Sequence, residues 1–136
     1  MREEALAMTA TGMTARELAD HFAPSGTIKL GSWSVTSTRH DLVECRATFA
    51  FDDRITSLSA VAAGPVGAMT SMLHEIGAPI SIVRSHQRVH DGQITAYMLC
   101  ERDERQVWAL GEGATCDEAN VNALIAGANR LMLASA

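Results

Sequence analysis

The chain carries one pattern twice, and the second copy, residues 85–129, shows it most clearly as SHQRVHDGQITAYMLCERDERQVWALGEGATCDEANVNALIAGAN. This stretch reads as a strand, a polar turn, an alternating strand, a charged turn, a third strand, a glycine-containing loop and a helix. Residues 34–77 give the same order of elements, with Gly64 before the helix where the second copy has Gly113. Neither copy buries enough surface alone, so the repeat predicts two similar halves that pack against each other.

Each copy has a central strand marked by alternation with a period of two. In the first copy, apolar residues occupy every second position from Val43 to Phe49, and residues 94–100 alternate in the same way. Short polar turns between such runs favour antiparallel hairpins. We expect six strands, at residues 28–37, 43–49, 55–62, 80–89, 94–100 and 107–110.

Each copy ends in an amphipathic helix with its own start signal. Pro65 suits the first position of a helix, because proline lacks the N–H that would be unpaired there. Thr115 and Glu118 form a capping box before the second helix. The apolar stripes at helical spacing are Val66, Met69, Leu73 and Ile76 in the first helix, and Val121, Leu124, Ile125, Ala128 and Met132 in the second.

These elements predict an α+β fold of two βββα units related by a pseudo-twofold axis, with helices on one face of sheet. Residues 14–136 form one domain, because 136 residues are too few for two. Thr14 and Glu17 form a further capping box at its start. Residues 1–13 have no clear period and read as a loose N-terminal lead-in.

Charge and hydropathy argue against nucleic acid and membrane as partners. The formal net charge is -5, and Lys29 is the only lysine, so no basic stripe is available for phosphates. Residues 55–73 carry no charge, but Gly64 and Pro65 interrupt them, so we expect a strand and a helix there and no membrane span.

The cysteines and the N-terminus indicate a cytoplasmic protein. Cys45, Cys100 and Cys116 lie far apart, an odd and unclustered set that fits reduced thiols better than disulfides. The N-terminus is acidic and no apolar segment follows it, so we see no secretory signal. His86 and His90 are four positions apart, but they straddle a strand end and a turn, and no Cys or carboxylate supplies a third ligand at suitable spacing, so we expect neither a metal nor a cofactor.

The chain resembles the C-terminal regulatory domain of 2-isopropylmalate synthase, an enzyme of leucine biosynthesis. The residues that match in order and spacing are Gly64, Pro65, Val66, Trp108, Gly111, Ala119, Ala128, Asn129 and Arg130. The resemblance covers residues 14–134 and implies two βββα units, a homodimer, and an allosteric domain that binds leucine as a feedback inhibitor. The family's catalytic barrel has no counterpart here, so the resemblance implies no condensing activity.

The chain departs from the family at loop positions. The family's first loop usually reads G-x-G-N-G-P-V-D-A, whereas residues 60–68 read AVAAGPVGA, with Ala63 in place of asparagine. Its second loop usually reads W-G-x-G followed by an apolar residue, whereas residues 108–112 read WALGE, with Glu112 at the apolar position. We therefore expect leucine to bind weakly, and another amino acid or small carboxylate to be the ligand.

The candidate ligand site combines the two loops with the strand between them. Helix N-termini hold small anions, because their first N–H groups are unpaired and the helix dipole adds positive charge. Glu112 is suited to an ammonium group if both loops belong to one pocket. The expected ligand-binding residues are Ala63, Gly64, Pro65 and Val66 in the first loop, Gly111 and Glu112 in the second and, as the resemblance implies, Ser85, His86 and Val89 on the strand.

Three functions are open on this reading. The leading hypothesis is a homodimeric, non-catalytic module that binds a small carboxylate or amino acid and regulates a separately encoded synthase. The second is an enzyme of specialised metabolism, of isomerase, cyclase or lyase type, with Glu112, His86 and His90 as acid–base groups. The third is a structural dimerisation element without a ligand, in which the glycines only permit the strand-to-helix turns.

Overall fold

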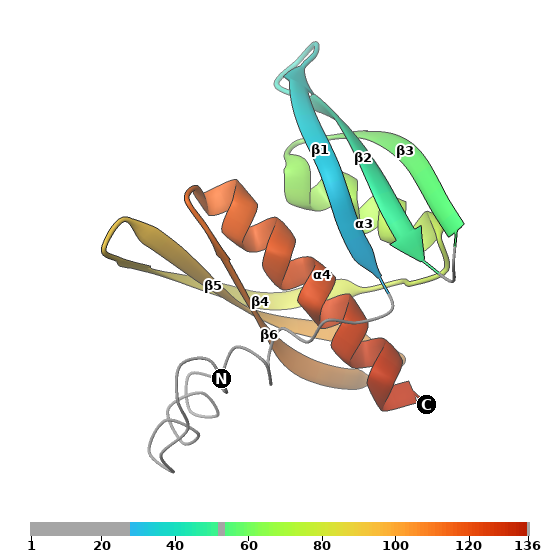
Figure 1. Cartoon of the computed structure of the whole chain (residues 1–136), viewed down its shortest axis with the longest axis vertical. Helices are drawn as coiled ribbons and strands as arrows, with labels where there is room; N and C mark the ends of the chain where they lie inside the picture. The colour runs from blue at the N-terminus through green and yellow to red at the C-terminus, as the bar shows by residue number, and fades with distance from the viewer. Residues whose placement is uncertain (1–27, 52–53, 136) are drawn as a thin grey trace.

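The computed structural model describes residues 28–51 and 54–135, which form two three-stranded antiparallel sheets and two helices (Figure 1). The first unit contains β1 (Lys29–Ser37), β2 (Val43–Phe51), β3 (Arg54–Ala62) and α3 (Pro65–Glu75). The second unit contains β4 (Ser81–His90), β5 (Gln93–Arg102), β6 (Arg105–Gly113) and α4 (Cys116–Ser135). The predicted fold of two βββα units is confirmed. The expected lead-in and the capping box at Thr14 and Glu17 lie outside the described residues.

Both sheets are meanders with the strand orders β1-β2-β3 (sheet A) and β4-β5-β6 (sheet B). The second-unit hairpins turn over two residues, Asp91-Gly92 and Asp103-Glu104. All four of these residues have positive φ, between 50° and 77°. Two successive left-handed residues match the right-handed twist of the flanking strands, which is why such tight turns select glycine and short polar residues.

The central strands bury the faces that their alternation predicted. In β2 the buried residues are Cys45, Ala47 and Phe49, and in β5 they are Ala96, Met98 and Cys100. The helices cover these faces, because α3 packs on β2 and β3 while α4 packs on β5 and β6.

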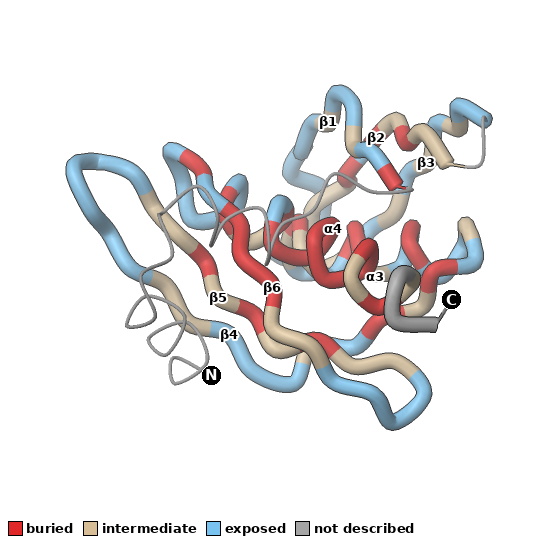
Figure 2. The backbone as a smooth tube through the Cα atoms, turned by 60° about the horizontal axis from the view of Figure 1, so that its bottom comes forward, coloured by how far each residue is buried: buried red, intermediate tan, exposed pale blue. Residues whose placement is uncertain are grey.

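Helix α4 is more deeply buried than a single apolar stripe predicts. It runs between the two sheets, and the buried residues gather around it (Figures 1 and 2). Ala119 and Ala123 are buried, and so are Val121 and Leu124 on the opposite side of the helix. One side of α4 packs on sheet B, and α4 also contacts α3. The helix therefore forms the centre of the core.

One predicted loop is wrong. We expected Gly111, Glu112 and Gly113 to leave the last strand, but all three belong to β6 and pair with Ala96, Thr95 and Ile94 of β5. The second helix begins at Cys116, directly after the N-cap predicted at Thr115.

The uncharged stretch 55–73 divides into β3 and α3, as expected from Gly64 and Pro65. Helix α3 ends at Glu75, and Gly77 follows with φ of 87°, the left-handed conformation that commonly terminates helices. Among the helices in the described part of the chain, none has the length and apolar character needed to cross a membrane.

A buried amide joins the two units. The N–H of Ile28 donates to Asn129 Oδ1 at 2.8 Å, and Asn129 Nδ2 donates to the carbonyl of Ile28 at 2.9 Å. Asn129 is 2% exposed and is the one buried polar side chain among the described residues. From its position on α4, the Asn129 side chain thus pairs with both the N–H and the C=O of Ile28, the residue before β1.

Replacing Asn129 by leucine should remove about 3 kcal/mol from the free energy of unfolding, because a buried N–H and a buried C=O both lose their partner. Asn122→Ala is the matched control, since the exposed Asn122 donates one bond to the carbonyl of Glu112. We expect the control to lose less than about 1 kcal/mol. Urea denaturation of the two variants measures both values, and equal losses would contradict the role given to Asn129.

Candidate functional site

The N-terminus of α3 has the open backbone that the sequence predicts. Gly64 is the N-cap residue, with extended backbone (φ -164°, ψ 173°), and Pro65 follows at the first helical position. No side chain caps this helix, and its first turn contains no acidic residue. The backbone N–H groups of Val66 and Gly67 are thus the helix donors that have no intrahelical acceptor.

Access to this N-terminus is unobstructed in the described structure. Ala63 and Gly67 are exposed, and Gly64 and Val66 are partly buried. A Cβ built on Gly64 would meet no atom within 4 Å. The junction is therefore an open, positively polarised end of a helix.

The N-terminus of α4 is already occupied by the chain's own groups. Thr115 Oγ1 accepts a hydrogen bond from the N–H of Glu118 at 3.1 Å, which confirms the predicted N-cap at Thr115. Asp117 and Glu118 place two carboxylates in the first turn. These two carboxylates would repel the carboxylate of a ligand, so the two predicted anion sites are not equivalent.

Gly111 and Gly113 have a packing role in β6. A Cβ on Gly111 would collide with the backbone of Ala123, and a Cβ on Gly113 would lie 2.7 Å from the N atom of Ala119. Both glycines thus face α4 and let it approach the strand closely. Local sequence cannot show this, because the residues that require the glycines follow several positions later in the helix.

Glu112 and His86 share the outer face of sheet B, away from α4, on two strands that are not neighbours. Glu112 is opposite Thr95, and His86 is opposite Tyr97 in the next row. β5 lies between them and separates the backbones of β4 and β6 by about 10 Å. The rings of His86 and Tyr97 have centroids 6.3 Å apart. Within one chain, β5 thus separates the strands that carry His86 and Glu112.

The remaining predicted residues of β4 do not line one surface. Ser85 is opposite the buried Met98, whereas His86 points to the other face, because side chains alternate along a strand. Val89 lies on the same side as Ser85 and is 72% exposed. His90 Nε2 lies 3.2 Å from the carboxylate of Asp91 in the exposed hairpin turn.

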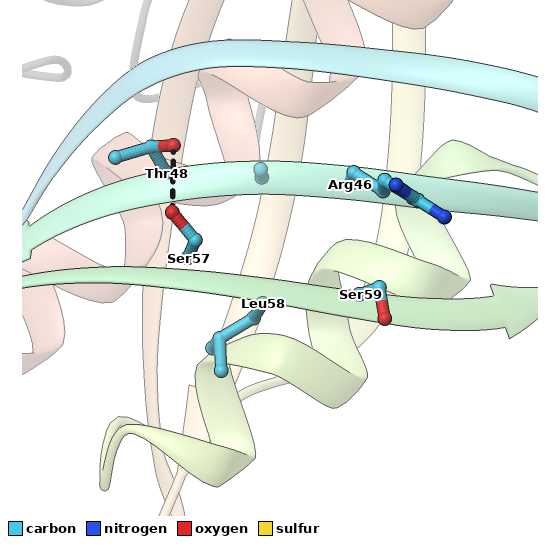
Figure 3. A pocket seen from close by; sticks show the side chains of 6 residues that line it. Arg46, Thr48, Ser57, Leu58 and Ser59 are labelled. Carbon is cyan, nitrogen blue, oxygen red and sulfur yellow. Dashed lines mark hydrogen bonds between the residues drawn. The ribbon is translucent and has the colours of Figure 1, made fainter.

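A shallow hollow of about 360 Å³ lies over β2 and β3 on the outer face of sheet A (Figure 3). Thr48 and Ser57 join their hydroxyls across the strands at 3.3 Å. The guanidinium of Arg46 lies 3.3 Å from the carboxylate of Glu44. Three of the polar side chains that line the hollow, those of Arg46, Thr48 and Ser57, thus already have partners in the chain.

A second hollow, of about 500 Å³, was not predicted. Its lining comes from two strands and the end of a helix: Phe49, Phe51, Arg54, Thr56, Leu58, Glu75 and Ile76. Arg54 is the first residue of β3, and Glu75 is the last residue of α3. No local signal joins them, because their proximity depends on how α3 packs on β2 and β3.

The potential metal ligands and the cysteines of the described residues meet little of what metal binding and thiol reactivity require. Over 28–51 and 54–135, no three His, Cys, Asp or Glu side chains stand close enough together to hold a metal ion. Burial raises the pKa of Cys45, and it raises the pKa of Cys100 to about 12 against a smaller lowering effect of the Arg130 charge. Both thiols therefore stay protonated at neutral pH, and Cys116 is the exposed cysteine.

Comparison with protein-family models gives no match, and comparison with curated proteins gives none either.

Native thiol reactivity should follow burial. We expect Ellman's reagent to modify Cys116 alone in the folded protein and all three cysteines after unfolding, because a buried, protonated thiol is a poor nucleophile. Cys116→Ser is the control and should show no rapidly reacting thiol in the native state. Rapid native modification of that variant would contradict the burial of Cys45 and Cys100.

Proposed function

We propose that this chain is a dimeric, non-catalytic binding module of regulatory type that takes up a small carboxylate or amino acid at the N-terminus of α3. The proposal combines the resemblance to the regulatory domain of 2-isopropylmalate synthase with the fold of two βββα units. The resemblance implies that fold, and the chain has it. A separately encoded synthase is the enzyme that such a module would regulate.

The asymmetry of the two helix N-termini carries the proposal. If both units were purely structural, we would expect both helices to be capped in the same way. Thr115 caps α4, whereas no side chain caps α3. A ligand carboxylate at the N-terminus of α3 would accept hydrogen bonds from the N–H groups of Val66 and Gly67. An aspartate side chain at the N-cap position would accept the same bonds. The helix dipole adds to this attraction, and the absence of acidic residues in the first turn preserves it.

Glu112 does not complete this site within one chain. It lies on the face of sheet B that points away from α4, whereas α3 packs on the other side of α4. An ammonium partner for an amino-acid ligand would have to come from a second copy. The enzyme hypothesis would need His86 and Glu112 to act together across β5, which lies between their strands.

Exposed aliphatic residues on the strands and turns support dimerisation. They are Val35, Leu42, Ile55, Val61, Val83 and Val89, each between 38% and 79% exposed. In the described sheets, β1, β3, β4 and β6 each have an edge without a strand partner. Pairing two copies would remove apolar area and sheet edges from water. We place the module in the cytoplasm, where free thiols such as these stay reduced.

A small carboxylate should raise the melting temperature of the protein, because it binds the folded state preferentially. The measurement is a thermal-shift screen over amino acids, 2-oxo acids and hydroxy acids, with leucine expected among the weak responders. No response to any carboxylate would favour the structural dimerisation element instead.

Gly64→Asp should abolish the response while stabilising the protein by about 0.5 kcal/mol, since its own carboxylate caps the helix. Gly64→Ala is the matched control: its backbone is extended and a Cβ has room, so it should keep the response. Loss of response in both variants would point to a steric effect and would count against the carboxylate site.

The protein should sediment at twice the mass of the chain at micromolar concentration, because the exposed aliphatic residues and open edges favour pairing. Sedimentation velocity over a range of concentrations measures this. A monomer throughout that range would remove the dimer from the proposal.

A further inference from the structure

The C-terminal end of α3 borders a cleft with an apolar floor and two opposite charges. Phe49 is fully buried beneath it, and Leu58 and Ile76 are half-buried along its walls. Arg54 and Glu75 are exposed residues that also line it. A cleft of about 500 Å³ lies within the range of roughly 300–1,000 Å³ that is typical of small-molecule sites.

The two charges do not neutralise each other. Among the described residues, no ion pair joins Arg54 to Glu75, although the structure records ion pairs elsewhere, such as Arg46 with Glu44. An apolar floor flanked by a separate cation and anion is complementary to a zwitterion with an apolar body. The guanidinium would hold its carboxylate, and Glu75 would hold its ammonium group.

Glu75 has no stabilising role in its own helix. It is the last residue of α3, at the negative end of the helix dipole, where a carboxylate is unfavourable. An ammonium group bound there would relieve this repulsion. The position of Glu75 thus favours a cationic group in the cleft.

We propose that this cleft is a second ligand site that binds an apolar dipeptide in its zwitterionic form. At about 500 Å³ the cleft has more room than a single aliphatic amino acid fills, and a dipeptide the size of leucyl-leucine fits within it. The site lies at the opposite end of α3 from the proposed carboxylate site and does not depend on it.

The test is isothermal titration calorimetry of the full chain with L-leucyl-L-leucine as the probe. We expect saturable binding to the wild type and weaker binding of leucine. Binding of the C-terminal amide and of the N-acetyl form should be about tenfold weaker, because each lacks one charge. Absence of saturable dipeptide binding, or equal affinity for all three dipeptide forms, would overturn the proposal.

Variants assign each charge to one side chain. Arg54→Gln should bind the dipeptide about tenfold more weakly and should no longer distinguish it from its amide. Glu75→Gln should lose the distinction from the N-acetyl form instead. Arg39→Gln, an exposed arginine in the β1–β2 turn, is the matched control and should bind as the wild type does. A loss in the control as large as in Arg54→Gln would overturn the assignment.

Two more variants distinguish the cleft from the carboxylate site and from a contact between two copies of the chain. Gly64→Asp should leave dipeptide binding unchanged, so failure of the α3 N-terminal site and failure of the cleft are distinguishable. Arg54→Glu should leave the oligomeric state unchanged. A dimer that this variant dissociates would assign the cleft to contact with a second copy and would overturn the ligand proposal.

Discussion

Helix α4 approaches sheet B at points where no side chain separates the two backbones. Gly111 and Gly113 of β6 face the helix, and Gly127 of the helix faces Cys100 of β5. A side chain at any of these positions would push the helix outward, since packed interiors have no spare volume. The close approach sets the depth of α4, and from that depth the helix reaches α3 and, through Asn129, the start of β1.

Features encoded locally are the ones that the sequence predicts well. The strands follow from their alternation because each has one buried face, and the turns follow from residues that tolerate positive φ. The end of β6 is the instructive failure. Gly111 and Gly113 read locally as a loop. They are glycines because α4 packs directly on them, and a short stretch of sequence does not contain both the glycines and the helix residues that contact them.

The candidate sites differ in the same way: those set by adjacent residues are predicted from the sequence, and those set by packing are not. Gly64 and Pro65 predict the α3 junction correctly, because capping depends on adjacent residues. The sequence leaves open whether His86 and Glu112 converge, because the order of the strands in a sheet is not a local property; they lie on β4 and β6, with β5 between them. The cleft at Arg54 and Glu75 escapes sequence reading altogether, because its walls meet only after α3 has packed on sheet A.

Duplication explains why the two units can differ at equivalent points. Two copies of one unit provide two strand-to-helix junctions. The fold requires both helices, but it does not require both junctions to be capped in the same way. Thr115 stabilises α4 through its own hydroxyl, so this helix is self-sufficient. The α3 junction lacks such a group, and it is the one whose donors are available to something other than the chain.

The bond between Ile28 and Asn129 spans 101 positions of sequence. A chain made from its N-terminus completes the first βββα unit at Glu75, well before Asn129 emerges from the ribosome. Until then the backbone groups of Ile28 have no amide to bind and α3 has no α4 to pack against. Because contacts so distant in sequence form late, the first unit lacks these contacts while the second unit is synthesised, and its apolar face stays uncovered until α4 has formed.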